Sequence, residues 1–255
     1  MKIYVCVKHV PDSAATITIR DTNQIDEAIT FLLNPYDENA VEESRRLKAM
    51  VEGAEVVAVT LGKPAAADTL RSAMAMGADR GILISTDTSK DAIITARALA
   101  KVIFQDGPPD IIFTGRESID SEGMQIMYRL GTNLHIPVAS NVVTFSHIGQ
   151  KVRVESEIEP GSRDVMEMTT PCVIGTAKGL NKPSYPTFPD IVKARKKLIT
   201  TIPLESLDIT PPVSGIDIVE LRPSVEKRLQ KELRGTPDEA AKKLITILKE
   251  KAKVI

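Results

Sequence analysis

The sequence has no tryptophan, and aromatic residues make up only 4% of its 255 residues. Proteins that bind single-stranded nucleic acids stack the bases on aromatic side chains, so this scarcity counts against that class of partner. The net charge of −1 gives no general electrostatic reason to bind nucleic acid or an anionic membrane surface. We therefore expect no nucleic-acid partner.

Cysteine and histidine are also scarce, with two cysteines and three histidines in the chain. Cys6 and Cys172 form no metal-type or redox-type pair, and both lie in apolar, strand-like sequence that indicates buried thiols. No two histidines stand at ligand spacing. We expect no metal site.

Long apolar runs and targeting signals are missing as well. No run is long enough to span a bilayer. The chain starts directly with the strand-like MKIYVCV, without the regions of a signal peptide. We expect a cytoplasmic protein, and the 42% hydrophobic and 26% charged residues are typical of a soluble globular chain.

The two commonest phosphate-binding motifs are absent. No GxGxxG follows the first predicted strand, and GxxxxGK[ST] occurs nowhere in the chain. This counts against a nucleotide-cleaving or adenylating enzyme.

What is present is a regular alternation of buried strands and amphipathic helices. It predicts a doubly wound, mostly parallel α/β sheet of the Rossmann-like kind. The predicted strands are residues 2–8, 55–61, 81–85 and 110–114, and the predicted helices are residues 34–48, 62–76, 92–103 and 126–134. Residues 10–13 are expected to break the first strand, and residues 16–20 to form a short exposed strand. Four further β-rich segments, residues 138–145, 151–158, 165–169 and 172–176, predict an antiparallel extension of the sheet.

The composition changes after Gly179, and we divide the chain into a nucleotide-binding domain, residues 1–182, and a second part, residues 183–255. Closely spaced prolines at 183, 186 and 189 predict an extended, exposed segment. The basic run that follows, residues 193–197, is more often a solvated helix face than a nucleic-acid patch. Residues 202–220 are expected to form an arm on a partner subunit, followed by an amphipathic helix at residues 238–251.

The stretch GRESIDSEGMQ, from Gly115 to Gln125, lies between a buried strand and a helix. In open α/β sheets ligands bind at this position, and helix amino termini offer N–H groups and a positive dipole end to phosphate. The segment NPYD offers a second helix start, with Asn34 as the N-cap and Pro35 in the first turn. Each stretch has a plain alternative, an ordinary strand–helix connection for the first and a well-made helix start for the second.

Five stretches together resemble a known family: VCVKHVPD, LLNPYDENAVEESRRLK, AMAMGADRGI, the GRESID loop with its glutamine, and GLNKPSYPTFPDIVKARKK. Over nearly its whole length the chain resembles the β (small) subunit of electron transfer flavoproteins. The resemblance implies a heterodimer with an α subunit that carries most of the FAD site, and an AMP in the β subunit. It also implies electron transfer from acyl-CoA or related dehydrogenases to a membrane quinone oxidoreductase or another acceptor, with no catalytic side chain in this subunit.

The resemblance also implies two sets of contact residues. Those for the nucleotide are Cys6, Asn34, Pro35, Tyr36, Asp37, Ala58, Leu61, Gly115, Arg116, Glu117, Ser118, Ile119, Asp120, Ser121, Glu122, Gly123, Met124, Gln125 and Ile126. Those for the dehydrogenase are Pro183, Tyr185, Phe188, Pro189 and Ile191.

The sequence departs from the family pattern at two positions. Phe188 occupies the anchor position where leucine is usual, and Met127 stands where many members have glycine, so that its side chain is expected to crowd a phosphate. Some relatives bind a second FAD in place of AMP and bifurcate electrons, and this alternative stays open. A stand-alone nucleotide-sensing module, similar to a universal stress protein, is disfavoured by the long carboxy-terminal arm.

Overall fold

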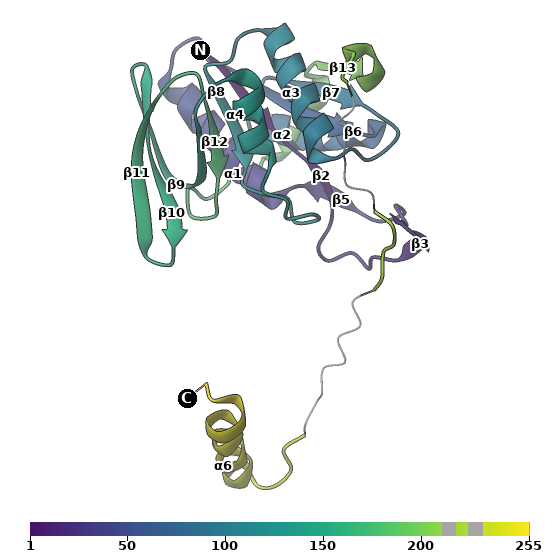
Figure 1. Ribbon diagram of the computed structural model, residues 1–255, viewed down its shortest axis with the longest axis vertical. Helices are drawn as coiled ribbons and strands as arrows, with labels where there is room; N and C mark the ends of the chain where they lie inside the picture. Colours follow the sequence, from purple (N-terminus) through teal and green to yellow (C-terminus); the bar gives the residue numbers. More distant parts are fainter. Residues whose placement is uncertain (211–217, 224–231, 255) are drawn as a thin grey trace.

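The computed structural model describes residues 1–210, 218–223 and 232–254, and over these residues a nine-stranded sheet forms the centre of the protein (Figure 1). The strand order is β11-β10-β9-β12-β8-β1-β6-β7-β13. The bounds in chain order are β1 (Lys2–Cys6), β6 (Glu55–Gly62), β7 (Arg80–Ser85), β8 (Ile111–Gly115), β9 (Val138–Ile148), β10 (Lys151–Glu159), β11 (Ser162–Thr169), β12 (Cys172–Thr176) and β13 (Ile199–Pro203). Two small two-stranded sheets pair β2 (His9–Pro11) with β5 (Phe31–Leu33) and β3 (Ile19–Asp21) with β4 (Gln24–Ile25).

Helices cover both faces of the sheet, and Figure 1 shows α3 and α4 together on its near side. Their bounds are α1 (Pro35–Met50), α2 (Ala67–Met76), α3 (Ala92–Asp106), α4 (Ile126–Leu134), α5 (Phe188–Lys196) and α6 (Pro237–Ile247), with short turns η1 (Pro64–Ala66), η2 (Leu204–Leu207) and the π-helical η3 (Leu248–Ala252). In the ranges that the structure describes, no helix has both the length and the apolarity to span a membrane.

The core consists of two layers because the central strands are apolar on both faces. In β1, Ile3 and Val5 belong to the cluster that contains buried residues of α1, α2 and α5. Tyr4 and Cys6, which point to the opposite face, belong to the cluster with α3 and α4. This alternation confirms the predicted doubly wound α/β sheet.

The chain reverses its direction of winding beside β1. It runs from β1 to β6 and β7 on one side, and then returns to place β8 on the other side of β1, with all of these pairs parallel. Such a reversal opens a crevice at the carboxyl ends of the two strands that flank it. The candidate site lies there.

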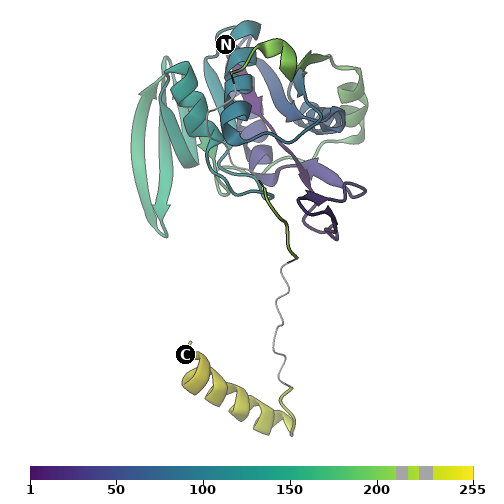
Figure 2. The same ribbon diagram turned by 45° about the vertical axis from the view of Figure 1, so that its right-hand side comes forward.

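The predicted antiparallel extension is confirmed for three of its four strands and wrong for β12. β9 pairs antiparallel with β10, and β10 with β11; β10 and β11 project as a long hairpin at one end of the sheet (Figures 1 and 2). β12 pairs in parallel with both of its neighbours, β8 and β9. β9 follows β8 through helix α4, and a strand–helix–strand crossover returns the chain in parallel, which residue periodicity alone does not reveal.

Several predicted boundaries also shift. Val10 and Pro11, expected to break the first strand, form the short strand β2 with His9. The exposed strand predicted at residues 16–20 is β3, and it begins only at Ile19. The helix predicted from residue 62 begins at Ala67, because β6 continues through Gly62 and η1 intervenes.

The proline-rich segment is only partly extended. Residues 181–187 have no regular structure, as predicted, but α5 begins at Phe188, so Phe188, Pro189 and Ile191 lie in the first turns of a helix. Thr187 and Asp190 form a capping box there, and Pro189 is tolerated because first-turn N–H groups need no helical partner. Lys193, Arg195 and Lys196 are exposed on α5, which confirms the predicted solvated basic face.

The predicted arm begins later than expected. β13 pairs in parallel with β7, and Leu204 and Leu207 of η2 are buried, so residues 202–207 belong to the sheet and its core. Residues 211–217 of the predicted arm lie outside the described residues. The final amphipathic helix is confirmed as α6 with η3, and none of its residues is buried.

Candidate functional site

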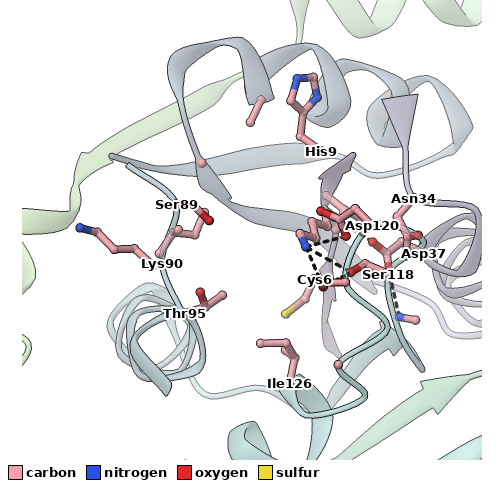
Figure 3. Close-up of a pocket in the computed structure, with 18 of the residues that line it drawn as sticks. Cys6, His9, Asn34, Asp37, Ser89, Lys90, Thr95, Ser118, Asp120 and Ile126 are labelled. Carbon is pink, nitrogen blue, oxygen red and sulfur yellow. Dashed lines mark hydrogen bonds and ion pairs between the residues drawn. The ribbon is translucent and has the colours of Figure 1, made fainter. Parts of the chain in front are cut away.

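A cavity of about 580 Å³ lies at the carboxyl ends of β1, β6 and β8. Figure 3 shows its side chains on facing walls around an open centre. Most of the predicted nucleotide contacts line it: Cys6, Asn34, Asp37, Leu61, Gly115, Arg116, Glu117, Ser118, Asp120, Ser121, Gly123, Met124, Gln125 and Ile126. Five others, Pro35, Tyr36, Ala58, Ile119 and Glu122, are not among the residues that line the cavity.

The loop after β8 forms one wall of this cavity. Its residues Glu122 and Met124 adopt left-handed conformations, with φ of 47° and 48°, on either side of Gly123. This part of the loop leads into α4, which begins at Ile126, and Gln125 is its N-cap residue. The predicted helix start at the end of the loop is therefore confirmed.

Asn34 holds the loop to the start of α1. It is the N-cap residue of α1, but its side chain makes no capping hydrogen bond. Instead, Nδ2 donates to the carbonyl oxygen of Glu117 at 2.8 Å, and Oδ1 accepts from the N–H of Ile119 at 3.2 Å. The expected capping role of this side chain is wrong, because the loop offers it a donor and an acceptor at once.

Asp37 joins the ends of β1 and β8 beneath the cavity. Its Oδ2 accepts from the N–H of Lys8 at 2.8 Å, and its Oδ1 accepts from the N–H of Gly115 at 2.9 Å. Burial raises the pKa of this carboxyl to about 7, although both N–H groups act to lower the pKa. A side chain at position 115 would not fit, because its Cβ would lie 2.4 Å from Asp37 Oδ1.

Lys8 lines this wall and brings a positive charge to it. Its Nζ lies 3.1 Å from Ser118 Oγ, 2.7 Å from Asp120 Oδ1 and 3.3 Å from Ser121 Oγ. The two serine hydroxyls lie 2.9 Å apart. An ammonium group and two rotatable hydroxyls provide hydrogen-bond donors for phosphate or sugar oxygens, and Asp120 balances the charge of Lys8.

The facing wall comes from the loop after β7 and the start of α3. Ser89, Lys90 and Thr95 line it, across the open centre from Ser118 and Asp120 (Figure 3). Lys90 Nζ donates to Thr88 Oγ1 at 2.7 Å, and the N-cap Asp91 accepts from the N–H of Ile94 at 2.8 Å. Sequence reasoning missed this wall, although the position of its loop at the carboxyl edge was available from the predicted strand order.

A third part of the lining carries an aromatic pair that sequence reasoning also missed. The ring of His9 stacks on Phe31 with centroids 4.7 Å apart, and His9 Nδ1 lies 2.7 Å from Thr69 Oγ1. Burial lowers the pKa of His9, which favours the neutral imidazole. This part of the cavity therefore offers a neutral, planar surface.

Neither cysteine suits chemistry that needs a thiolate. Cys6 and Cys172 are free and buried, as predicted, and burial raises the pKa of both thiols. Over the described part of the chain, no group of three metal-ligating side chains is positioned to hold a metal ion.

Met127 does not crowd the cavity. Its side chain is fully buried in the core between the sheet and helices α3 and α4. There its sulfur faces Gly175 of β12, where an added Cβ would lie 2.6 Å from it. The expectation that Met127 obstructs a phosphate is therefore wrong in this structure.

The predicted dehydrogenase contacts lie outside the cavity, around the start of α5. Tyr185 and Phe188 are 93% and 77% exposed. Pro189 and Ile191 are also exposed, while Pro183 is partly buried. The segment presents two large aromatic side chains to solvent.

Comparison with known proteins identifies the family. The family model described as "Electron transfer flavoprotein domain" matches residues 22–207. The chain is 34% identical to the electron transfer flavoprotein subunit beta of Syntrophomonas wolfei over 254 residues, covering 100% of this chain and 98% of that protein. It is 32% identical to the corresponding Bacillus subtilis subunit over 260 residues, covering 100% of each chain. It is also 32% identical over 220 residues to the "Caffeyl-CoA reductase-Etf complex subunit CarD" of Acetobacterium woodii, covering 85% of this chain and 84% of that protein. The fold, the family match and these full-length similarities together show that the chain belongs to the electron transfer flavoprotein family, among its β subunits.

Proposed function

We propose that this chain is the nucleotide-holding subunit of a heterodimeric, cytoplasmic electron carrier. Its partner is an α subunit that carries most of the FAD site. The flavin accepts electrons from an acyl-CoA dehydrogenase or a related enzyme and passes them to a quinone oxidoreductase or another acceptor. The chain contributes no catalytic side chain, since the flavin carries the electrons and the protein positions it.

The cavity beside Lys8 carries this proposal. Its volume of about 580 Å³ is typical of small-molecule sites, which span roughly 300–1,000 Å³. It lies where parallel α/β sheets bind ligands, and the Lys8, Ser118 and Ser121 donors stand beside the loop that leads into α4. AMP is the nucleotide that this subunit is proposed to hold, and no electron passes through it.

One observation favours the alternative of a second FAD. The polar side chains of the lining lie on two facing walls, and the stacked His9 and Phe31 rings lie in a third part of it. A mononucleotide needs only the wall of Ser118 and Asp120, whereas a dinucleotide extends to Lys90 or to the stacked rings. The caffeyl-CoA reductase complex subunit among the relatives makes this alternative worth testing in the same experiment.

The test is to express the chain with and without an electron transfer flavoprotein α subunit from the same organism. Together they should give a yellow heterodimer with about one FAD, while the chain alone should hold no stoichiometric FAD, because it lacks a complete dinucleotide motif. Denaturing the heterodimer and separating the released nucleotides should yield AMP in addition to FAD. Two FAD and no AMP per heterodimer would assign the second-flavin alternative, and release of no nucleotide beyond one FAD would overturn the proposed AMP site.

Lys90→Ala separates the two occupants. If AMP alone fills the cavity beside Ser118 and Ser121, this variant keeps its nucleotide content. If a second FAD extends to the facing wall, the variant loses flavin. Lys151→Ala, which removes an exposed lysine at the start of β10, is the matched control.

A further inference from the structure

Helix α1 contacts two different regions of the protein with its first and second turns. The first turn carries Asp37, which lines the cavity. The second carries Asn39, Glu42 and Glu43, whose exposed fractions are only 4%, 1% and 7%. Buried polar side chains in native proteins nearly always have partners, so these three identify what covers the helix.

The cover is the segment that follows β12. Asn39 Nδ2 donates to the backbone oxygen of Asn181 at 3.1 Å and to its Oδ1 at 2.9 Å. In return, Asn181 Nδ2 donates to the backbone oxygen of Asn39 at 3.0 Å. The two asparagines therefore bind each other reciprocally, side chain to backbone in both directions.

Two buried carboxylates extend this contact. Asn181 Nδ2 also donates to Glu43 Oε2 at 2.9 Å, and the N–H of Ser184 donates to Glu42 Oε2 at 3.4 Å. Glu42 is fixed in turn by Arg45, whose NH2 group lies 2.8 Å from Oε1. Because Arg45 already fixes the Glu42 carboxylate, this carboxylate loses little entropy when it accepts a hydrogen bond from the segment. The contact therefore favours one position of the segment.

The segment from Asn181 leads directly to the exposed aromatic residues. Residues 182–187 have no regular structure, so the position of Tyr185 depends on where the segment is held at each end. At the far end α5 is held by Arg71, whose NH1 donates to the backbone oxygen of Ala194 at 2.8 Å. At the near end the segment is held by the hydrogen bonds between Asn39 and Asn181.

We propose that Asn39 and Asn181 form a side-chain clamp that positions Tyr185 and Phe188 for docking of the redox partner. The docking role itself rests on the proposed function. Neither asparagine lines the cavity, so both act as positioning residues. Removing the clamp should increase the number of positions that the segment samples, and docking then has to reorder it.

Hydrogen exchange in the complete heterodimer tests the clamp without any partner. Of the four hydrogen bonds that the two asparagine side chains make in this contact, Asn181→Ala removes three and Asn39→Ala removes two. Net contributions of hydrogen bonds of this kind predict that the amide of Ser184, which donates to Glu42, exchanges about five- to tenfold faster in each variant. The double variant should exchange no faster than the faster single variant, because both substitutions break the same contact.

Electron transfer kinetics test the consequence for docking. With an acyl-CoA dehydrogenase from the same organism, reduced by its acyl-CoA, as the electron donor, both variants should raise KM about three- to tenfold and change kcat by less than twofold. The flavin spectrum and the released nucleotide should equal those of the unaltered heterodimer. Asn133→Ala, an exposed asparagine on α4, is the matched control and should change neither exchange nor KM.

The outcomes separate the clamp from the docking role. Unchanged exchange at Ser184 in both variants would overturn the clamp. Faster exchange with an unchanged KM would overturn its part in docking. Phe188→Ala is measured beside them: if it also leaves KM unchanged, the proposed docking role fails, and the clamp is then judged by exchange alone.

Discussion

Gly115→Ala is expected to displace the start of α1 from the end of β8 and to abolish the proposed nucleotide binding in the cavity. The new Cβ would lie 2.4 Å from Asp37 Oδ1, 2.8 Å from Tyr36 Cβ and 2.9 Å from the carbonyl carbon of Tyr36. Two of these neighbours are not the ends of flexible side chains, so a rotamer change cannot relieve the contact. α1 has to move, and with it the hydrogen bond from the N–H of Gly115 to Asp37.

The cost follows from these two effects. Overpacking of a well-packed site costs about 1–3 kcal/mol. A hydrogen bond to a charged or partly charged carboxyl contributes about 1.5–3 kcal/mol, and part of it is lost when α1 moves. A total of about 3 kcal/mol is a reasonable expectation, which in a protein of this size lowers Tm by about 6–12 °C.

Calorimetry of the heterodimer and chromatography of the nucleotide released by denaturation measure the two consequences. Gly123→Ala is the matched control in the same loop, since its added Cβ meets no heavy atom within 4 Å. It should keep the wild-type Tm, and it serves as the control for Tm alone because Gly123 lines the cavity. If Gly115→Ala keeps the wild-type Tm and a full complement of nucleotide, the close approach of Asp37 to β8 does not hold the cavity together and the reasoning is refuted.

Three further predictions concern other parts of the chain. Burial raises the pKa of Asp37 to about 7, so the folded protein binds this proton more tightly than the unfolded chain does. The protonated Asp37 therefore contributes to the free energy of unfolding at low pH, and this contribution falls as pH rises from about 4 to about 7. Asp37→Asn should flatten that part of the pH dependence measured by urea unfolding, and an unchanged slope would contradict the assignment. Phe188→Ala should raise KM for the reduced dehydrogenase about tenfold, while the flavin spectrum and Tm stay unchanged. The control is Phe104→Ala, because Phe104 is 69% exposed on α3. Loss of flavin or stability with an unchanged rate per flavin would show that Phe188 has a structural role. Arg80→Gln should lower the free energy of unfolding by about 2 kcal/mol, because Arg80 binds both Asp106 and Glu55 at the amino edge of the sheet. The nucleotide content of this variant should not change. A stability equal to wild type would show that these two ion pairs do not stabilise the fold.

The strand–helix alternation and the position of the loop after β8 were predictable because both depend on local sequence. The buried run before Gly115 and the apolar spacing from Ile126 each follow from the residues within one element. Strand direction was less accessible, since β9 and β12 have the composition of any β-strand. Their parallel pairing results from the crossover through α4, which is a property of the whole chain path.

The side-chain contacts of the site were not predictable from local patterns. Asn34 has the identity and position of an N-cap, yet its amide binds the backbone of Glu117 and Ile119 instead. Lys8 follows the first strand as an ordinary polar residue, and only the fold brings it to Ser121, more than a hundred positions later. Local sequence indicates which hydrogen bonds a side chain can make within its own element. The tertiary fold determines which distant partner it binds instead.

The second turn of α1 shows the same limit most clearly. Its residues Asn39, Glu42 and Glu43 are polar, and helical periodicity places such residues on a solvent-facing side. All three are buried, because the segment from Asn181 covers them and satisfies their hydrogen bonds. A buried polar helix face therefore indicates that a segment distant in sequence covers it. In this chain that segment leads to the exposed Tyr185 and Phe188, so α1 contacts both the cavity wall and the base of the proposed docking surface.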